Sequence, residues 1–209
     1  MGEESRFDKL SDMEVDVLKE ISNIGTGNAA TAVSQMLESR VDIEVPVIKF
    51  LSFSEVSDVI GGAENEVIGI LVTIENDIDG MMVFILDKYS ASVIVNRILS
   101  REMEGPLESL TELEHSVLTE FGNILAGSYL SAISKLTGLA ISPSVPALSD
   151  DMAGAILSVP AIEFGRISDK VLLIQSVFDT DDKRAEGFCI FIPTHEAFKK
   201  IMGKLGLIG

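Results

Sequence analysis

The sequence predicts an α+β fold of two similar halves, each in the order α-β-α-β-β-α, with long surface helices packed on a largely antiparallel sheet. The first reason is an internal repeat, since shifting the chain by 100 residues aligns Ser11–Pro46 with Thr111–Pro146 without a gap. The second reason is that each half contains two adjacent apolar segments with the spacing of a hairpin, and hairpins pair strands antiparallel. Together these observations predict a pseudo-twofold arrangement of mixed helices and strands.

The repeat preserves polar as well as apolar positions, which chance seldom does. The residues that recur identically 100 positions later are Glu14, Val17, Leu18, Glu20, Asn23, Ile24, Gly27, Ala32, Ser34, Val45 and Pro46. We therefore interpret residues 1–209 as a single domain with repeats over about 11–104 and 111–209 and a linker over about 102–110.

Each repeat opens with the pattern of a helix start. A hydroxyl residue stands three positions before a glutamate, which is a capping box. The two boxes are Ser11 with Glu14 and Thr111 with Glu114. The apolar spacing that follows predicts helices from about Asp12 to Leu37 and from about Glu112 to Leu136.

Two glycines, Gly25 and Gly27, lie inside the first of these helices. Glycine in a helix interior costs about 1 kcal/mol relative to alanine. Their presence predicts close helix packing, or a kink, just beyond Asn23.

Shorter elements follow each long helix in the same order. Apolar runs bounded by turn-forming residues predict the strands, and amphipathic runs predict the helices. In the first half these are a strand Val41–Ile48, a short helix Ser54–Ile60, a hairpin of Val67–Ile74 with Met81–Leu86 and a helix Tyr89–Leu99. In the second half they are a strand Ile141–Ala147, a short helix Asp150–Leu157, a hairpin of Val171–Phe178 with Gly187–Ile192 and a helix His195–Leu205. Because the hairpin strands are almost wholly apolar, both faces of the sheet are expected to be covered.

The charge of the chain limits its partners. Asp and Glu number 33 against 16 Lys and Arg, which gives a formal charge of -17. Such a field repels phosphate backbones and anionic lipids, so neither nucleic-acid binding nor membrane insertion is expected. No apolar run reaches the roughly 18 residues of a membrane span. The segment Met1–Lys9 lacks the pattern of a signal peptide, so a cytoplasmic location is expected.

Few residues are available for metal or disulfide chemistry. Cys189 is the single cysteine, which excludes an internal disulfide and a thiolate metal cluster. His115 and His195 are too few for a histidine-rich site. The sequence therefore predicts no metal or cofactor of the protein's own.

A polar stripe recurs on one face of both predicted long helices. With Asp16 as the origin and 100° per residue, Glu20 lies at about 40° and Asn23 at about 340°. The second copy repeats the stripe as Ser116, Glu120 and Asn123. The apolar residues of both segments lie on the opposite side, so the stripe faces solvent, where a Glu and an Asn have no packing reason to recur. We interpret the stripe as functional; the alternative is a relic of the duplication.

The residues of the stripe resemble a known motif. The pattern Asp/Ser-x-x-x-Glu-x-x-Asn, followed by 22 residues and a Pro, is similar to the motif of the CheC family of chemotaxis phosphatases. The first copy matches it with Asp16, Glu20, Asn23 and Pro46, and the second with Ser116, Glu120, Asn123 and Pro146. The surrounding segments Glu20–Ala32 and Phe121–Leu130 also resemble the family, and the likeness extends over essentially the whole chain. CheX-type relatives carry one motif, so two motifs favour CheC proper.

This resemblance implies an activity and a division of roles. CheC proteins dephosphorylate the phospho-aspartate of the response regulator CheY. By resemblance, Glu20 and Glu120 would engage the regulator's lysine, and Asn23 and Asn123 would orient the attacking water. Asp16, Ser116, Pro46 and Pro146 would support these catalytic residues. The Mg²⁺ of the reaction is expected on the phosphorylated partner.

The family also pairs with the receptor deamidase CheD, so a monomer or a heterodimer with CheD is expected. The residues expected to face CheD are Asp150, Asp151, Met152, Ala153 and Ala155. From the residues alone, this segment is equally a core helix of small residues with an acidic N-cap.

Two other functions remain open. One is a non-enzymatic adaptor, a flagellar-switch or CheD-binding module whose motifs are vestigial. The other is a metal-dependent hydrolase, which is disfavoured because Asp16, Glu20 and Asn23 without a histidine would hold only a weakly bound hard cation.

Overall fold

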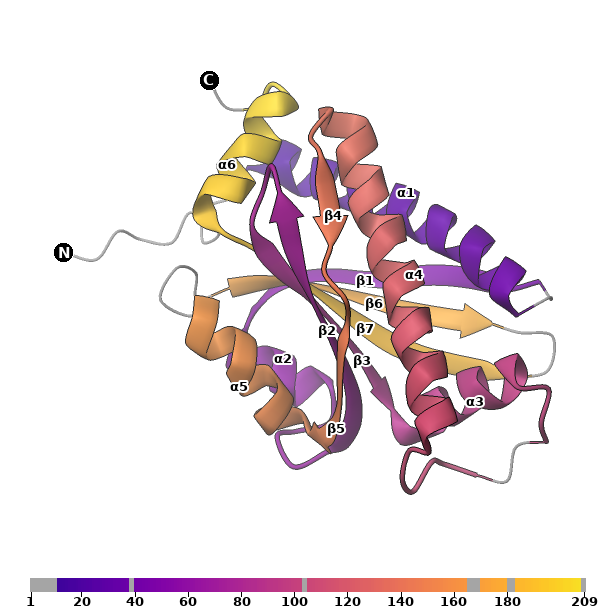
Figure 1. Cartoon of the computed structure of the whole chain (residues 1–209). Helices are drawn as coiled ribbons and strands as arrows, with labels where there is room; N and C mark the ends of the chain where they lie inside the picture. The colour runs from indigo at the N-terminus through magenta and orange to yellow at the C-terminus, as the bar shows by residue number, and fades with distance from the viewer. Residues whose placement is uncertain (1–10, 38–39, 103–104, 165–169, 180–182, 208–209) are drawn as a thin grey trace.

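The computed structural model describes residues 11–37, 40–102, 105–164, 170–179 and 183–207. In these ranges six helices cover the two faces of one seven-stranded sheet (Figure 1). The first half consists of α1 (Asp12–Met36), β1 (Asp42–Ser52), α2 (Phe53–Val59), β2 (Glu66–Asn76), β3 (Gly80–Asp87) and α3 (Lys88–Ile98). The second half consists of α4 (Glu112–Thr137), β4 (Ile141–Pro143), β5 (Ala147–Met152), α5 (Ala153–Phe164), β6 (Lys170–Asp179), β7 (Arg184–Pro193) and α6 (His195–Lys204). The predicted α+β fold is confirmed, but the first strand expected in the second half is split in two.

The strand order shows how the two halves combine. The sheet runs β1-β6-β7-β3-β2-β4, and β5 also pairs with β2. Exchanging β1 with β4, β2 with β6 and β3 with β7 gives the same strand order in reverse. All strand pairs are antiparallel. The outer strand of each half therefore pairs with the hairpin of the other half. The pseudo-twofold axis passes between β3 and β7, where Val83 lies opposite Ile190. The division into one domain with two repeats and a linker stays a prediction.

Both faces of the sheet are covered, as predicted. Alternate residues of β3 point to opposite faces, because side chains alternate along a strand. Met82 and Phe84 join the core beneath α1, α3, α4 and α6, whereas Met81 and Val83 join the smaller core beneath α2 and α5. Figure 1 shows α1 and α4 side by side on one face, with α2 and α5 on the other.

The two long helices make close contact at a glycine. A Cβ at Gly25 would lie 2.5 Å from Cδ1 of Tyr129, so no larger residue fits without movement. The hydroxyls of Thr26 and Tyr129 lie 3.0 Å apart in the same buried contact, and burial raises the pKa of Tyr129 to about 12. The predicted close packing is confirmed at Gly25, but nothing lies within 4 Å of a Cβ at Gly27.

The start of the second half differs from the prediction. A strand Ile141–Ala147 and a helix from Asp150 to Leu157 were expected, but β4 ends at Pro143 and β5 extends to Met152. Proline has no N–H to donate, which accounts for the break between Pro143 and Pro146. Residues 147–152 pair with the edge of β2, and this pairing outweighs the local preference for a helix start. The helix α5 therefore begins only at Ala153.

Candidate functional site

The first polar stripe lies on the outer face of α1. Asp16, Glu20 and Asn23 are all exposed, whereas Leu18 and Ile21 on the opposite side are buried in the main core. The capping box at the helix start is present as predicted, with the Ser11 hydroxyl accepting from the N–H of Glu14. The helix thus holds three polar side chains in one row that points away from the sheet.

The second stripe has the same placement on α4. Ser116, Glu120 and Asn123 are exposed, and Leu118 and Phe121 between them are fully buried. The ring of Phe121 packs edge-on against Phe178 of β6, with ring centroids 5.6 Å apart. Packing of the apolar side therefore fixes which way the polar row faces.

The Glu and Asn side chains of both stripes are available to a partner. In the part of the chain that the structure describes, no hydrogen bond or ion pair involves the side chains of Glu20, Asn23, Glu120 or Asn123. Residues three apart on a helix have Cβ atoms roughly 5–6 Å apart, so each Glu and its Asn can reach the same small region of another molecule.

The first residue of each stripe is held locally. Asp16 Oδ1 forms an ion pair with Lys19 Nζ at 3.4 Å, and both side chains are largely exposed. Ser116 Oγ instead donates to the carbonyl of Glu112 at 2.9 Å. The first copy therefore has an ion pair at the edge of the stripe, whereas the second has the two uncharged residues Ser116 and Thr119 at the equivalent positions.

The two stripes are well separated. Met36 of α1 and Glu114 of α4 both lie beside the C-terminal end of α3, so the two helices are antiparallel. Thr26 of α1 faces Tyr129 of α4 where the helices touch. Glu20 precedes Thr26 by six positions, and Glu120 precedes Tyr129 by nine. At 1.5 Å of rise per residue, the two glutamates are about 20 Å apart along the helices. The two stripes are therefore too far apart to form one composite surface.

The prolines of the motif lie on the outer strands. Pro46 lies in β1 at an irregularity between Glu44 and Val47, and its side chain is outside the described part of the structure. Pro146 lies between β4 and β5 and is half-buried. Ala147, the residue after it, pairs with Leu71 of β2, and the neighbouring Ile70 of β2 packs against Gly122 of α4. Pro146 is therefore on the sheet edge beside the motif segment of α4.

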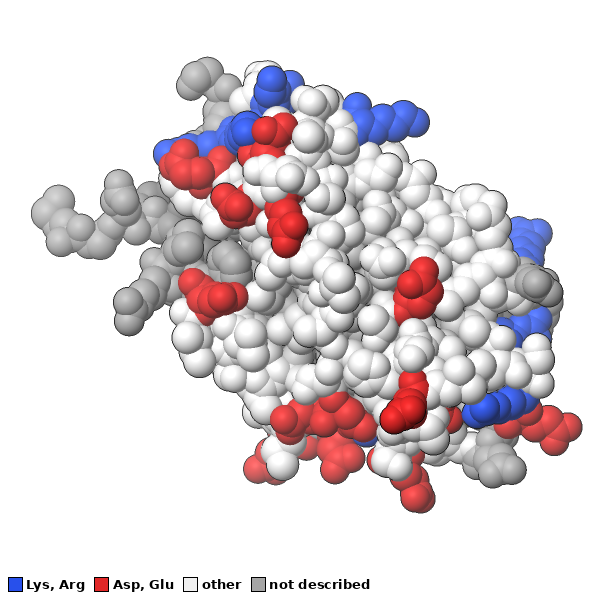
Figure 2. Space-filling model, viewed as in Figure 1, with Lys and Arg blue, Asp and Glu red and all other residues white. Residues whose placement is uncertain are grey.

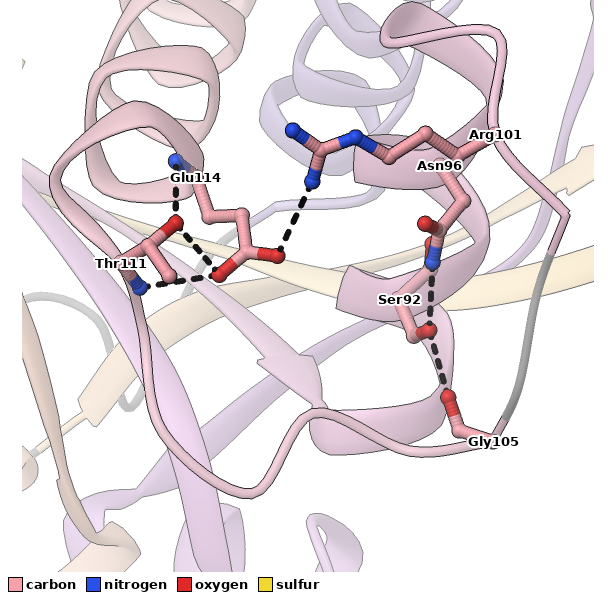
Figure 3. A network of polar contacts seen from close by, with 6 residues as sticks. All are labelled: Ser92, Asn96, Arg101, Gly105, Thr111 and Glu114. Atoms are coloured by element: carbon pink, nitrogen blue, oxygen red, sulfur yellow. Dashed lines mark hydrogen bonds and ion pairs between the residues drawn. The ribbon is translucent and has the colours of Figure 1, made fainter.

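The start of α4 is held by a polar network (Figure 3). The backbone N–H of Thr111 donates to Glu114 Oε2 at 2.9 Å, and the N–H of Glu114 donates to the Thr111 hydroxyl at 3.3 Å. Arg101 Nη1 lies 3.6 Å from Glu114 Oε1. The hydrogen bond from the Thr111 backbone, then that from its hydroxyl, and the charge of Arg101 hold the pKa of Glu114 below its usual value.

The linker before α4 is also tied to α3. Ser92 Oγ donates to the carbonyl of Gly105 at 2.6 Å, and Asn96 Nδ2 donates to the carbonyl of Ser92 at 2.9 Å (Figure 3). The loop from Gly105 to Thr111 is thereby anchored at both ends, which fixes where the second stripe begins.

The capping box predicts a pH dependence of stability. Because the pKa of Glu114 is lowered on folding, its contribution is present above the unfolded value near 4.5 and is lost as the pH falls through the folded value. We expect Glu114→Ala to lower the free energy of unfolding by about 1 kcal/mol at pH 7, and by much less at pH 3. Urea denaturation at both pH values measures this. Glu112→Ala, at an exposed position of the same turn, is the control, and an equal loss for Glu114→Ala at both pH values would contradict the assignment.

The surface around α4 carries no concentration of positive charge. Figure 2 shows a mostly uncharged face with isolated acidic side chains over α4, and Lys and Arg near its margins. In the described ranges, no group of three or more His, Cys, Asp and Glu side chains is placed to hold a metal ion. None of the helices described has the length and apolar character to cross a membrane.

Comparison with known proteins places the motifs in a family. The model of the CheC-like family matches residues 13–50 and 113–149, which contain both stripes. A Bacillus subtilis (strain 168) protein named CheY-P phosphatase CheC is 35% identical over 206 residues, covering 97% of this chain and 98% of that protein. The chain belongs to the CheC-like family. The resemblance predicted from the motifs is confirmed.

Two further similarities concern FliY proteins. The flagellar motor switch phosphatase FliY of Bacillus subtilis (strain 168) is 30% identical to this CheC-like chain over 139 residues, which are 66% of the chain but 36% of FliY. The crystal structure of Thermotoga maritima FliY superposes with a TM-score of 0.75 at 23% identity, covering 94% of this chain and 98% of that one. At this identity the structural likeness establishes the fold.

The residues predicted to face CheD do not form one helix in this CheC-like chain. Asp150, Asp151 and Met152 end β5, whereas Ala153 and Ala155 begin α5. Asp150 is ion-paired with Lys88 of α3, and Ala153 is fully buried. The expectation of a helix over this segment is therefore wrong. Asp150 is exposed but engaged by Lys88, and Asp151, Met152 and Ala155 are exposed outside this ion pair. The ion pair joins segments far apart in sequence, and nothing in the local pattern indicates it.

A further exposed pair was not predicted as part of the site. Met13 and Leu113 are 64% and 50% exposed at equivalent positions of α1 and α4. The signal available in the sequence is their place on the stripe, since Met13 lies at about 60° from Asp16 on the helical wheel.

Proposed function

We propose that this protein is a phosphatase that hydrolyses the phospho-aspartate of a CheY-type response regulator at two equivalent sites. The observation that carries the proposal is the repeated Glu-x-x-Asn pair, which is exposed on both long helices and makes no side-chain hydrogen bond or ion pair in the described part of the chain. The name of the Bacillus subtilis relative, CheY-P phosphatase CheC, supports the same reaction.

The chemistry follows from the side chains. Glu20 or Glu120 accepts from the lysine beside the phosphorylated aspartate, which fixes the regulator on the helix. Asn23 or Asn123 offers one acceptor and two donors and so orients a water in line with the phosphorus. The water oxygen bonds to phosphorus, the bond from phosphorus to the aspartate oxygen breaks, and the water protons pass to the phosphate product and to solvent.

The site needs no strong base. An acyl phosphate has a good leaving group, so positioning the water and compensating charge suffice. Mg²⁺ bound to the regulator would neutralise charge on the phosphoryl oxygens. The sparse positive charge around α4 fits a helix that completes another protein's active site rather than one that holds phosphate alone.

The test is the decay of phosphorylated CheY with substoichiometric amounts of this protein. We expect turnover faster than the regulator's own hydrolysis, with inorganic phosphate released. Decay at the intrinsic rate, with the chain folded by circular dichroism, would overturn the proposal and leave the non-enzymatic adaptor. The pairing with CheD through Asp151, Met152 and Ala155, as a heterodimer, remains a separate proposal.

A further inference from the structure

Each long helix begins with one exposed apolar side chain. Met13 and Leu113 are equivalent under the repeat, and they stand between acidic residues in the first turn of α1 and α4. They are 64% and 50% exposed, and neither belongs to the two cores of the protein. Their exposure in both copies is therefore not explained by folding.

Both side chains extend the rows that carry the Glu and Asn residues. On the helical wheel Met13 lies about 20° from Glu20, and the same spacing places Leu113 in line with Glu120. At 1.5 Å per residue, each apolar side chain is about 10 Å from the Glu and about 15 Å from the Asn of its copy. A molecule that contacts Glu and Asn together would extend over the apolar residue as well.

We propose that Met13 and Leu113 are docking anchors for the phosphorylated receiver domain of the regulator, one for each site. The inference rests on the proposed function and names how that site gains affinity. A chain of charge -17 repels the phosphoryl group that it must approach. An apolar contact beside the lysine-binding glutamate adds affinity without adding repulsion, and buried apolar anchors commonly dominate such interfaces. Its partner surface is an apolar patch about 10 Å from the regulator's active-site lysine.

The test separates docking from chemistry. We expect the double variant Met13→Ser, Leu113→Ser to raise KM for phosphorylated CheY about tenfold while kcat stays within about twofold. Binding to CheY activated with beryllofluoride and Mg²⁺, measured by fluorescence anisotropy, should weaken by the same factor. The conservative exchange Met13→Leu, Leu113→Met should restore both values. A matched control is Val159→Ser, Ile162→Ser, because these residues are 44% and 77% exposed on α5 at the other face of the sheet.

Each anchor should act only on its own copy. When Asn123→Ala disables the second site, Met13→Ser should raise KM and Leu113→Ser should not; with Asn23→Ala the roles reverse.

Unchanged KM and unchanged binding in the serine double variant would overturn the anchors while the phosphatase stands. If the native chain fails to hydrolyse but binds activated CheY, the phosphatase fails and the anisotropy of the serine variant still decides the anchors. If the native chain neither hydrolyses nor binds, both proposals are wrong.

Discussion

Replacing Asn23 and Asn123 together with alanine is expected to lower the rate of CheY dephosphorylation by about 10²-fold. Each amide is proposed to hold the attacking water in line, and alanine leaves that water without an acceptor or donor. Neither asparagine contributes packing, since both are exposed. Alanine is also the better helix former, so the melting temperature should stay the same or rise slightly.

The single variants and a nearby asparagine complete this experiment. Asn23→Ala and Asn123→Ala each leave one site intact, so the two residual rates should add up to the native rate and thereby rank the sites. Asn28→Ala is the matched control, because Asn28 is exposed on α1 but is not part of the stripe. A double variant that dephosphorylates CheY at the native rate would show that the asparagines do not orient the water.

The long helices and their polar rows could be predicted because the signals are local. A capping box needs four residues, and both boxes form as the sequence indicates. The 3.6-residue period then separates Glu20 and Asn23 from Leu18 and Ile21, and the structure places them on opposite sides. Gly25 and Gly27 also predicted close packing or a kink beyond Asn23. The close contact occurs at Gly25, with Tyr129 of the other repeat.

The second strand of the second half could not be predicted because its cause is distant. Residues 147–152 are a strand because the edge of β2, some 80 residues earlier, pairs with them. Their own pattern, two aspartates before small apolar residues, equally suits a helix start. The exposure of Met13 and Leu113 could not be predicted either. Helical periodicity gives the direction of a side chain, but whether another segment covers that side chain depends on the rest of the fold.

The interleaved sheet leads to the last expected result: neither half of the chain should fold alone. In the structure β1 pairs with β6, and β4 and β5 pair with β2, so each outer strand finds its partner in the other half. In a separate half, the backbone N–H and C=O groups of that strand would lose their hydrogen-bond partners. The apolar edge at which β3 pairs with β7 would also be exposed. The main core also draws side chains from both long helices. Fragments over residues 1–104 and 111–209 should each show low ellipticity and no cooperative urea transition.

Mixing and cutting distinguish this topology from a pair of independent domains. Equimolar fragments should regain the native spectrum and one cooperative transition, because the missing partners are then supplied in trans. The matched control is the full chain cut once within the linker by an inserted protease site, which contains the same two pieces already folded together. It should stay associated in gel filtration and unfold in one step, and at lower urea than the intact chain because the tether is gone. A fragment that unfolds cooperatively by itself would show that the repeats are separate domains and that the exchanged strands are dispensable.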